Sequence, residues 1–437
     1  MRKQPNRRRL LVVALLSTVF AAVVPYGRAS EQFHKTFTFG ALAPDPSNIL
    51  VRPDSLFSDA AGHGFEPGAK IASITDKHAT YCAGEGPFYF SVAVGEGNYR
   101  VTVTFPMVPA DRTPMVKAEL RRLMLEPITL APAEPIVRSF IVNVRTPKIP
   151  GGQSVRLKVP RETIDEAWAW DGKLTLEFNA PRPCLAKLEI EKVDVPTVFI
   201  LGDSTVCDQP HEPYASWGQM LPRFFKPDIA VANHAESGET LASSSAAHRL
   251  DKVLSVLKAG DYVLIQYGHN DMKSKAPDAA QVYKATLKKW VQQIKSRGGI
   301  AVLITSMNRH SFSGDQVINS LREYPQMVRE AASEENVAMV DLNRMSKTLY
   351  EALGPHDSIR LFKHNPDLSQ FDGTHHSSYG AYELAKCVVE GIRQGKLALA
   401  EHLADDVRPF DPSKPDAETD VQIAPSPGVV GVKPLGD

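Results

Sequence analysis

The chain has 437 residues, of which 43% are apolar and 23% charged, so a buried core is feasible and a wholly disordered chain is excluded. This length suggests two or three domains. Cations and acids number 50 each, but the first 29 residues hold six cations and no acid, so the remainder has 44 cations against 50 acids, a net charge of −6. A mildly acidic protein is not suited to coating nucleic acid or anionic lipid, and any anionic ligand must be held by local cations.

The N-terminus has the pattern of a secretory signal peptide over residues 1–29. A basic start that includes Arg7–Arg9 is followed by an apolar run over residues 10–24, and Gly27-Arg28-Ala29 offers a cleavage site. The run is shorter than the ~20 residues that cross a bilayer. An uncleaved membrane anchor is the alternative, and Arg7-Arg8 is also compatible with twin-arginine export. We expect an exported protein, periplasmic or extracellular, without membrane contact once the signal is removed.

Four cysteines follow this segment: Cys82, Cys184, Cys207 and Cys387. No two have the spacing of a zinc motif, and we expect neither a metal nor an organic cofactor. An even number of cysteines in an exported protein permits disulfides. Cys82–Cys184 is the preferred pair because both residues fall in the N-terminal domain, and four buried thiols are the alternative.

Residues 30–195 are predicted to form a β-sandwich. Alternating or β-branched runs recur, Gly and Pro clusters separate them, and long helical periodicity is missing. The expected strands are 37–39, 88–94, 99–105, 136–144, 174–178 and 185–193.

Residues 196–405 alternate short apolar runs with amphipathic stretches, which is typical of a parallel sheet covered by helices on both faces. This order predicts an α/β fold, a flavodoxin-like doubly wound domain whose functional residues lie beyond the C-terminal ends of the strands. The final residues, 406–437, are rich in proline and are expected to be disordered. The expected strands are 197–201, 229–233, 262–267, 300–305 and 337–341, and the expected helices include 250–257, 282–294 and 317–332.

The first strand of this sheet runs into Gly202-Asp203-Ser204. A serine on a tight turn after a strand can expose its hydroxyl, which is a sensible placement for a nucleophile. By itself the tripeptide is weak evidence, because such residues are more often helix N-caps.

The second and third strands lead into polar turns that contain Gly238 and Asn270. Glycine lets a backbone N–H approach a ligand closely, and asparagine supplies an amide donor. Together with the N–H of Ser204, they could form a three-donor oxyanion hole. Ordinary turns are the alternative, because Gly, Asn and Asp are common in them.

A carboxylate and an imidazole occur three residues apart, at Asp372 and His375. A serine nucleophile needs an imidazole to take its proton and a carboxylate to orient that imidazole. The two residues can meet within one turn. The alternative is a helix N-terminus with Asp372 as its cap.

The residues Ser, Gly, Asn and Asp-x-x-His follow one another in the order of the SGNH (GDSL-like) hydrolases, and the chain resembles that family over residues 196–395. The surrounding motifs are similar to the rhamnogalacturonan acetylesterase group, and the N-terminal portion resembles the galactose-binding-like domains attached to some of these esterases. The motifs are Leu201-Gly202-Asp203-Ser204-Thr205-Val206, Trp217-Gly218-Gln219, Gly260-Asp261-Tyr262, Gln266-Tyr267-Gly268-His269-Asn270-Asp271, Asp372-Gly373-Thr374-His375 and Gly380-Ala381.

The resemblance implies a serine esterase. It implies that Ser204 is the nucleophile, that His375 is the general base and acid, and that Asp372 orients His375. It further implies that the oxyanion is bound by Gly238 and Asn270 together with the backbone of Ser204.

The turn after Gly238 and the candidates Arg309 and His269 concern the identity of the substrate. After Gly238 the chain reads Glu239-Thr240-Leu241-Ala242-Ser243, where the resemblance leads us to expect a more basic or Ser-rich turn. Arg309, after the fourth strand, could bind a uronate carboxylate through two parallel hydrogen bonds. The alternative is that Arg309 is a solvated arginine of a loop. His269 is a second substrate-binding candidate, but His269 and His376 each lie beside a proposed catalytic residue and are expected to be pocket walls.

The sequence therefore predicts a secreted esterase that removes acetyl groups from an acetylated plant cell-wall polysaccharide or oligosaccharide, with rhamnogalacturonan as the expected substrate. An acetylxylan esterase or another SGNH acyl hydrolase is the nearer alternative, and a non-catalytic carbohydrate-binding protein is the more distant one. Because all the proposed chemistry follows Val195, we expect the α/β domain to cleave a small acetyl ester without the β-sandwich.

Overall fold

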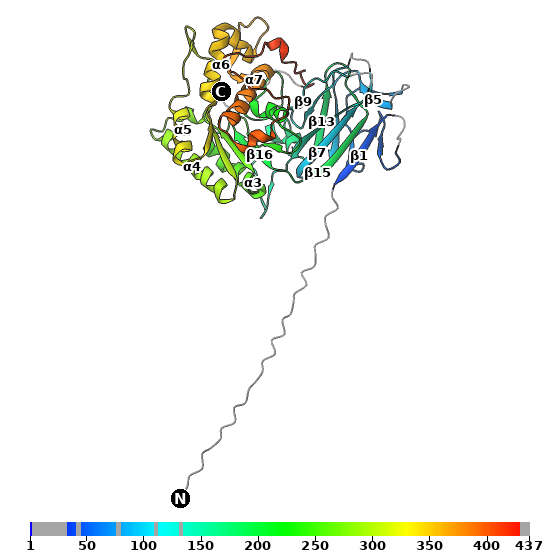
Figure 1. Cartoon of the computed structure of the whole chain (residues 1–437), viewed down its shortest axis with the longest axis horizontal. Helices are drawn as coiled ribbons and strands as arrows, with labels where there is room; N and C mark the ends of the chain where they lie inside the picture. Colours follow the sequence, from blue (N-terminus) through cyan, green and yellow to red (C-terminus); the bar gives the residue numbers. More distant parts are fainter. Residues whose placement is uncertain (2–32, 41–44, 76–79, 109–111, 131–133, 429–437) are drawn as a thin grey trace. The chain divides into compact units, whose positions relative to one another are not determined.

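The computed structural model of the chain, drawn in Figure 1, describes residues 1, 33–40, 45–75, 80–108, 112–130 and 134–428. The predicted signal peptide lies outside these residues, apart from Met1. Within the described part of the chain, no helix combines the length and the apolar character that crossing a membrane requires.

The N-terminal region consists mainly of antiparallel sheets, as predicted. One five-stranded sheet has the order β10-β7-β15-β1-β2 and another has the order β3-β6-β13-β8-β9. Their bounds are β1 His34–Phe39, β2 Ile49–Val51, β3 His63–Phe65, β6 Phe88–Ala93, β7 Gly97–Phe105, β8 Met115–Ala118, β9 Arg122–Leu125, β10 Ile136–Val144, β13 Lys173–Asn179 and β15 Lys187–Val193. A smaller sheet joins β14 (Cys184–Leu185), β5 (Thr80–Gly84) and β4 (Ile71–Thr75).

The two larger sheets share one aromatic core. Alternate residues of β7 are buried, as expected for a strand with one face against the core. Phe37 of β1 and Phe90 of β6 come from different sheets, and their ring centroids are 5.4 Å apart in an edge-to-face arrangement. The sandwich is therefore closed by aromatic side chains from both sheets.

The second half of the chain forms a parallel five-stranded sheet with the order β17-β16-β18-β19-β22, which confirms the predicted fold class. The strands are β16 Thr197–Gly202, β17 Ala230–Asn233, β18 Tyr262–Gln266, β19 Ile300–Ile304 and β22 Ala338–Val340. The helices are α1 Trp217–Met220, α2 Leu241–Ala246, α3 Arg249–Val256, α4 Ala279–Ser296, α5 Tyr324–Glu334, α6 Leu342–Asp357 and α7 Ser378–Gln394.

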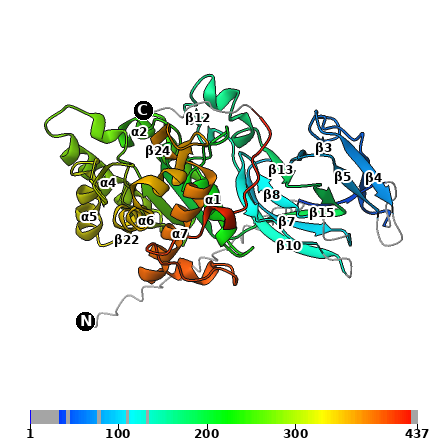
Figure 2. The same ribbon diagram turned by 90° about the horizontal axis from the view of Figure 1, so that it is seen from above.

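Both faces of this sheet are buried, which explains why its strands are continuously apolar. Phe199 and Leu201 of β16 pack in a cluster with side chains of α2, α3, α4 and α5. Val198 and Ile200 face the other way and pack with side chains of α1, α6 and α7. Figures 1 and 2 show these helices around the sheet.

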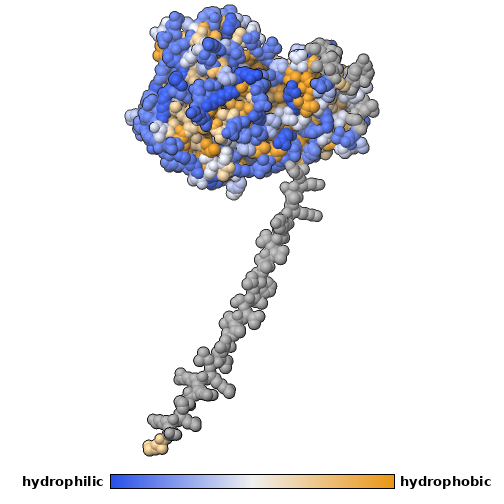
Figure 3. Space-filling model, viewed as in Figure 1, coloured by the Kyte–Doolittle hydropathy of each residue, from blue (hydrophilic) through white to orange (hydrophobic). Residues whose placement is uncertain are grey.

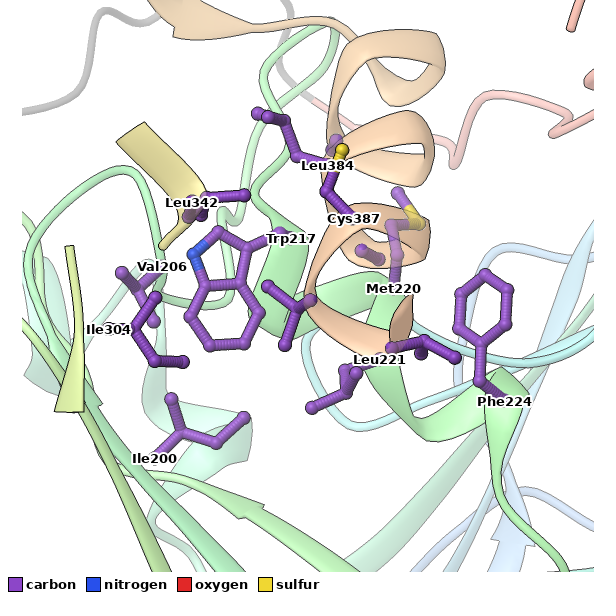
Figure 4. Close-up of a cluster of buried hydrophobic side chains, with 14 of the residues drawn as sticks. Ile200, Val206, Trp217, Met220, Leu221, Phe224, Ile304, Leu342, Leu384 and Cys387 are labelled. Atoms are coloured by element: carbon purple, nitrogen blue, oxygen red, sulfur yellow. The ribbon is translucent and has the colours of Figure 1, made fainter. Parts of the chain in front are cut away.

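Trp217 lies at the centre of the second cluster. Its side chain is fully buried and lies among Ile200, Ile304 and Leu342 in Figure 4. The indole N–H donates a 2.8 Å hydrogen bond to the side chain of Gln266 at the end of β18. The motif that contains Trp217 thus ties α1 to the strand ends.

The predicted helix over residues 317–332 begins too early. Residues 312–313 and 316–317 instead form a small hairpin, and α5 starts at Tyr324 with Pro325 in its first turn. Proline is tolerated there because the first helical N–H groups have no partner within the helix, whereas it breaks a helix interior.

The proline-rich tail is not disordered over residues 406–428. Lys117 Nζ donates hydrogen bonds to the carbonyl of Ala424 and to the hydroxyl of Ser426, both at 2.7 Å, and Asn179 Nδ2 donates to the carbonyl of Pro425 at 3.0 Å. Polar side chains of the β-rich region therefore donate hydrogen bonds to carbonyl and hydroxyl groups of the tail, which has no helix or sheet partners there. The remaining residues, 429–437, lie outside the described part.

The preferred disulfide is not formed. Cys82 on β5 has a free, buried thiol, and burial raises its pKa to about 12. Cys184 lies on the adjacent strand β14, where it is also buried. Both residues serve as small apolar side chains of the sandwich core.

On the face drawn in Figure 3, hydrophilic side chains cover most of the surface, and apolar side chains reach it in separate patches. This distribution agrees with the concentration of large apolar side chains in the cores of the two regions.

Candidate active site

Ser204, His375 and Asp372 form a continuous hydrogen-bonded chain. His375 Nε2 lies 2.9 Å from Ser204 Oγ, and His375 Nδ1 lies 3.0 Å from Asp372 Oδ2. The serine and the histidine are only 3% and 2% exposed. In this geometry an imidazole can take the proton of the serine hydroxyl, while the carboxylate orients the ring and stabilises the cation that forms.

The carboxylate of Asp372 is kept ionised by its hydrogen bonds. Burial raises the pKa of Asp372, but the hydrogen bond and charge of His375 and the backbone N–H groups of Thr374 and His375 lower it by more, so the pKa lies well below its usual range. The two backbone donors lie 2.9 and 3.0 Å from Asp372 Oδ1. This carboxylate is ready to stabilise an imidazolium at any working pH.

Asp372 is not a helix cap. It lies on β24 (Phe371–His376), which pairs with β23 (Phe362–His364). The following helix, α7, is capped by Ser377, whose hydroxyl accepts the N–H of Gly380 at 3.2 Å.

The turn after β16 holds Ser204 firmly. The carbonyl of Ser204 accepts hydrogen bonds from Gln209 Nε2 at 2.6 Å and from the Ser216 hydroxyl at 2.8 Å. The preceding Asp203 accepts the backbone N–H and the hydroxyl of Thr205 at 3.0 and 2.8 Å. The nucleophile candidate therefore lies on a turn whose backbone and neighbouring side chains have fixed partners.

Gly238 and Asn270 lie on the loops that follow β17 and β18, the two strands that flank β16. Gly238 has a φ of 74°, in the left-handed region that favours glycine. Asn270 Nδ2 donates to the carbonyl of Glu239 at 3.0 Å, and its Oδ1 accepts from Lys273 at 3.2 Å. An amide NH2 has two N–H groups, so the fixed amide of Asn270 has a second one to offer to an oxyanion.

His269 contacts the turn of Ser204 and the loop that follows β19. It is 1% exposed, its Nε2 lies 3.1 Å from the carbonyl of Met307, and its Nδ1 lies 3.5 Å from Asp203 Oδ2. The latter distance is long for a hydrogen bond. These contacts surround the ring, and His269 is not among the residues that line the cavity beside Asp372.

His376 is also buried, but on the other side of β24. Its Nε2 lies 3.0 Å from the hydroxyl of Tyr350, and its ring stacks on Phe362 with centroids 4.6 Å apart. Burial, followed by the charges of His375 and His269, lowers the pKa of His376 to about 3. The ring is therefore neutral at working pH and packs in the core against Tyr350 and Phe362.

A cavity of about 530 Å³ adjoins the carboxylate of Asp372. Three cations, Lys273, Arg309 and Lys363, line it together with uncharged side chains such as Tyr214 and Phe371. Arg309 also donates a hydrogen bond to the carbonyl of His269 at 3.2 Å, which joins it to the loop after β18. The predicted substrate-binding arginine thus belongs to a cationic cavity in a protein whose net charge after residue 29 is negative.

Sequence reasoning missed basic residues that the β-rich region contributes to the active-site loops. Arg121 NH1 donates to the carbonyls of Gln209 and Tyr214 at 2.9 and 3.0 Å, and Arg122 pairs with Asp208 at 2.6 Å. Two adjacent arginines in an acidic protein were a signal of local positive charge. Their partners lie about 90 residues further along the chain, so no sequence spacing reveals them.

A group of three buried carboxylates, Glu162, Glu166 and Glu236, has oxygens within 4.8 Å of one another. Two guanidinium groups already face this group, since Arg161 pairs with Glu166 at 2.6 Å and Arg249 pairs with Glu162 at 2.6 Å. Burial and the neighbouring Glu236 raise the pKa of Glu166. The paired arginines and a proton on Glu166 thus explain how three carboxylates can lie together in the interior. The cluster is an ionic link between the two regions.

The site and the sheet together are those of an α/β serine hydrolase, because a Ser–His–Asp chain lies at the C-terminal ends of parallel strands. Residues 200–380 match the GDSL-like lipase/acylhydrolase family, and the chain belongs to that family.

The sequence relatives agree with this assignment. The chain is 38% identical to the rhamnogalacturonan acetylesterase RhgT of Bacillus subtilis (strain 168) over 217 residues, which cover 47% of this chain and 93% of the relative. It is 28% identical to the probable rhamnogalacturonan acetylesterase YesY of the same strain, over 47% of this chain and 96% of the relative. The crystal structure of the protein YXIM from Bacillus subtilis is 23% identical and covers 84% of this chain and 99% of its own, with a TM-score of 0.46.

Proposed function

We propose that the protein is an exported acetylesterase that removes acetyl groups from plant cell-wall polysaccharide, with acetylated rhamnogalacturonan as its substrate. The observation that carries the proposal is the Ser204–His375–Asp372 chain beside a cavity lined by three cations. The name of the relative RhgT supports the same substrate class.

The geometry is suited to an acyl-enzyme reaction. Ser204 Oγ attacks the acetyl carbonyl carbon while His375 Nε2 takes the hydroxyl proton. The negative charge on the carbonyl oxygen is met by the N–H groups of Ser204 and Gly238 and by the amide of Asn270. Collapse of this intermediate breaks the bond to the sugar oxygen, which takes the proton from His375. Water, activated by His375, then attacks the acetyl-serine and releases acetate.

The cationic cavity is suited to a uronate. Rhamnogalacturonan carries one carboxylate on each galacturonate residue, and a guanidinium can bind a carboxylate with two parallel hydrogen bonds. Lys363 and Lys273 add two further cations to the same cavity as Arg309. Acetylated xylan, the substrate of the alternative esterase, has a neutral backbone and gains much less from three cations.

Acetate release from acetylated rhamnogalacturonan and from acetylated xylan tests this proposal. We expect a higher kcat/KM on rhamnogalacturonan, and we expect Lys363→Met to lower that value by about tenfold, the effect of losing a hydrogen bond to a charged group. The same variant leaves kcat/KM on xylan unchanged. Lys289→Met is the matched control, because Lys289 is an exposed lysine of α4 that does not line the cavity.

Two results would contradict the proposal. Faster turnover of acetylated xylan, with no effect of Lys363→Met on either polymer, would indicate an acetylxylan esterase. Binding of either polymer without any acetate release would indicate a carbohydrate-binding protein.

A further inference from the structure

Residues 155–162 of the β-rich region, here called the basic arm, reach the loop that follows β17. The N–H of Arg156 donates to the carbonyl of Ala247 after α2 at 3.0 Å. Near the other end, Glu162 accepts the N–H of Lys158 at 2.8 Å and pairs with Arg249 of α3 at 2.6 Å. The arm is therefore anchored to α2 and α3 on either side of its basic side chains.

Lys158 binds the oxyanion loop, which we define as residues 236–239. Its ammonium donates to the carbonyl of Ser237 and lies 3.0 Å from Glu239 Oε1. The carboxylate of Glu239 is 2% exposed, whereas the side chain of Lys158 is 28% exposed. Lys158 thus covers the loop from the solvent side and neutralises a buried acid.

Arg161 binds the same loop from within. Its Nε lies 3.0 Å from Glu236 Oε1, and its NH2 group donates to the hydroxyl of Ser237 at 3.0 Å. A second acid of the arm's own region, Glu166, lies 2.6 Å from Arg161. Since Arg161 is buried between two carboxylates, its position is fixed by its charge, and it fixes the loop in turn.

The carbonyl that Lys158 binds belongs to the same peptide unit as the N–H of Gly238. A peptide unit is planar, and in its trans form the C=O and N–H groups point in opposite directions. A cation on the oxygen of Ser237 therefore fixes the direction of the Gly238 N–H, and it also polarises the amide and strengthens that N–H as a donor.

This arrangement accounts for the acids in the oxyanion loop. The family resemblance led us to expect a more basic or Ser-rich turn after Gly238, and the chain has Glu239 directly after it. The complementary cations, Lys158 and Arg161, come from a segment about 80 residues earlier in the chain. The oxyanion loop and the basic arm therefore carry opposite charges and are joined by ion pairs.

We propose that Lys158, supported by Arg161, is a positioning residue of the active site, which aims the Gly238 N–H at the oxyanion. This inference rests on the proposed function, because it assigns the Gly238 N–H to the oxyanion hole. It makes the β-rich region part of the catalytic machinery, which differs from our expectation that the α/β domain acts alone.

The test compares full-length Lys158→Met with the wild type on a small neutral acetyl ester. Methionine keeps the aliphatic stem but removes the charge. We expect kcat to fall by about 10- to 100-fold, somewhat less than the loss on removing a whole oxyanion donor, while KM changes less than twofold. The affinity for a boronic acid, which mimics the tetrahedral intermediate, is expected to fall in parallel with kcat, and Lys158→Arg is expected to restore part of both.

Arg223→Met is the matched control. Arg223 also links the two regions, through Glu126 at 2.7 Å and the tail residue Asp406 at 2.7 Å, but it does not contact the oxyanion loop. We expect its kcat and boronate affinity to equal those of the wild type, even where its melting temperature falls as much as that of Lys158→Met.

The inference is overturned if folded Lys158→Met keeps a kcat within twofold of the wild type, or if Arg223→Met loses as much kcat as Lys158→Met. Failure of the proposed function is a separate result, since it requires that the wild-type protein itself release no acetate. An active wild type with an unaffected Lys158→Met variant refutes this inference alone.

Discussion

Two histidines that are neighbours in the chain lie in different surroundings. His375 contacts both Ser204 and Asp372, whereas His376 contacts Tyr350 and Phe362 in the core. Because members of a catalytic triad act as a unit, we expect His375→Ala to lower kcat by about 10⁴- to 10⁶-fold with little loss of stability.

His376→Ala is expected to have the opposite profile. A neutral, stacked ring contributes packing, so its removal costs about 1–3 kcal/mol of unfolding free energy and roughly tenfold or less in kcat. Steady-state kinetics and urea unfolding of both variants measure the two effects. An inactive His376→Ala beside an active His375→Ala would move the base to His376.

The buried carboxyl of Glu119 is expected to make the free energy of unfolding depend on pH. Burial raises its pKa to about 8, against the opposing effects of Arg122 and the Thr175 N–H. The folded state therefore holds this proton more tightly than the unfolded chain, whose carboxyl has a pKa near 4.5. The stabilisation is complete below about pH 4.5, falls by about 1.4 kcal/mol per pH unit above it, and is lost as the pH passes 8.

Glu119→Gln removes this titration while keeping an acceptor for the Thr175 N–H, which lies 3.0 Å from Glu119 Oε1. Between pH 5 and pH 8 we expect the wild type to lose roughly 2–4 kcal/mol more stability than the variant. Urea unfolding at both pH values measures the difference. Equal losses in the two proteins would show that Glu119 is ionised in the folded state.

At the scale of elements, α7 approaches the chain before β23 so closely that only glycine fits at position 380. A Cβ on Gly380 would lie 1.8 Å from the carbonyl oxygen of Leu361. We expect Gly380→Ala to destabilise the protein by about 1–3 kcal/mol, although alanine is the better helix former by about 1 kcal/mol. The control is Gly86→Ala, where a Cβ meets nothing within 4 Å. Thermal unfolding that shows equal stability for both variants would contradict this close approach.

The elements that the sequence predicted well are those with one dominant physical signal. Strands β16 to β19 are short apolar runs buried on both faces, and the predicted bounds agree with the structure to within a residue or two. The start of α5 was misplaced because the apolar pattern continues back into a hairpin, and Pro325 was the better marker. The ordered tail could not be predicted, since its hydrogen bonds go to Lys117 and Asn179, which are far away in the chain.

At the scale of the whole molecule, the two regions share a core and a set of buried ion pairs. Met115 and Leu123 of the β-rich region pack in the same cluster as Trp217 of the α/β domain. From Phe33 onward the chain forms one compact unit. We expect calorimetry to show a single cooperative unfolding transition. Two resolved transitions, with one region surviving the loss of the other, would contradict this coupling.

The candidate site could be predicted from the sequence only as far as strand order allows. Ser204, Gly238 and Asn270 follow adjacent parallel strands, so topology alone brings their loops together. Lys158 and Arg161 have no such pattern, because electrostatic pairing between distant segments leaves no periodic trace in a sequence. For the same reason, the expectation that the α/β domain acts without the β-rich region did not anticipate these contacts.

The most direct test of the account is to trap the acyl-enzyme. Acid quenching during turnover of an acetyl ester, followed by peptide mass spectrometry, is expected to find one acetyl group on the peptide that contains Ser204. Ser204→Ala is expected to fold, to carry no acetyl group and to release no acetate. Turnover without acetylation at Ser204, together with a folded and active Ser204→Ala variant, would contradict the mechanism.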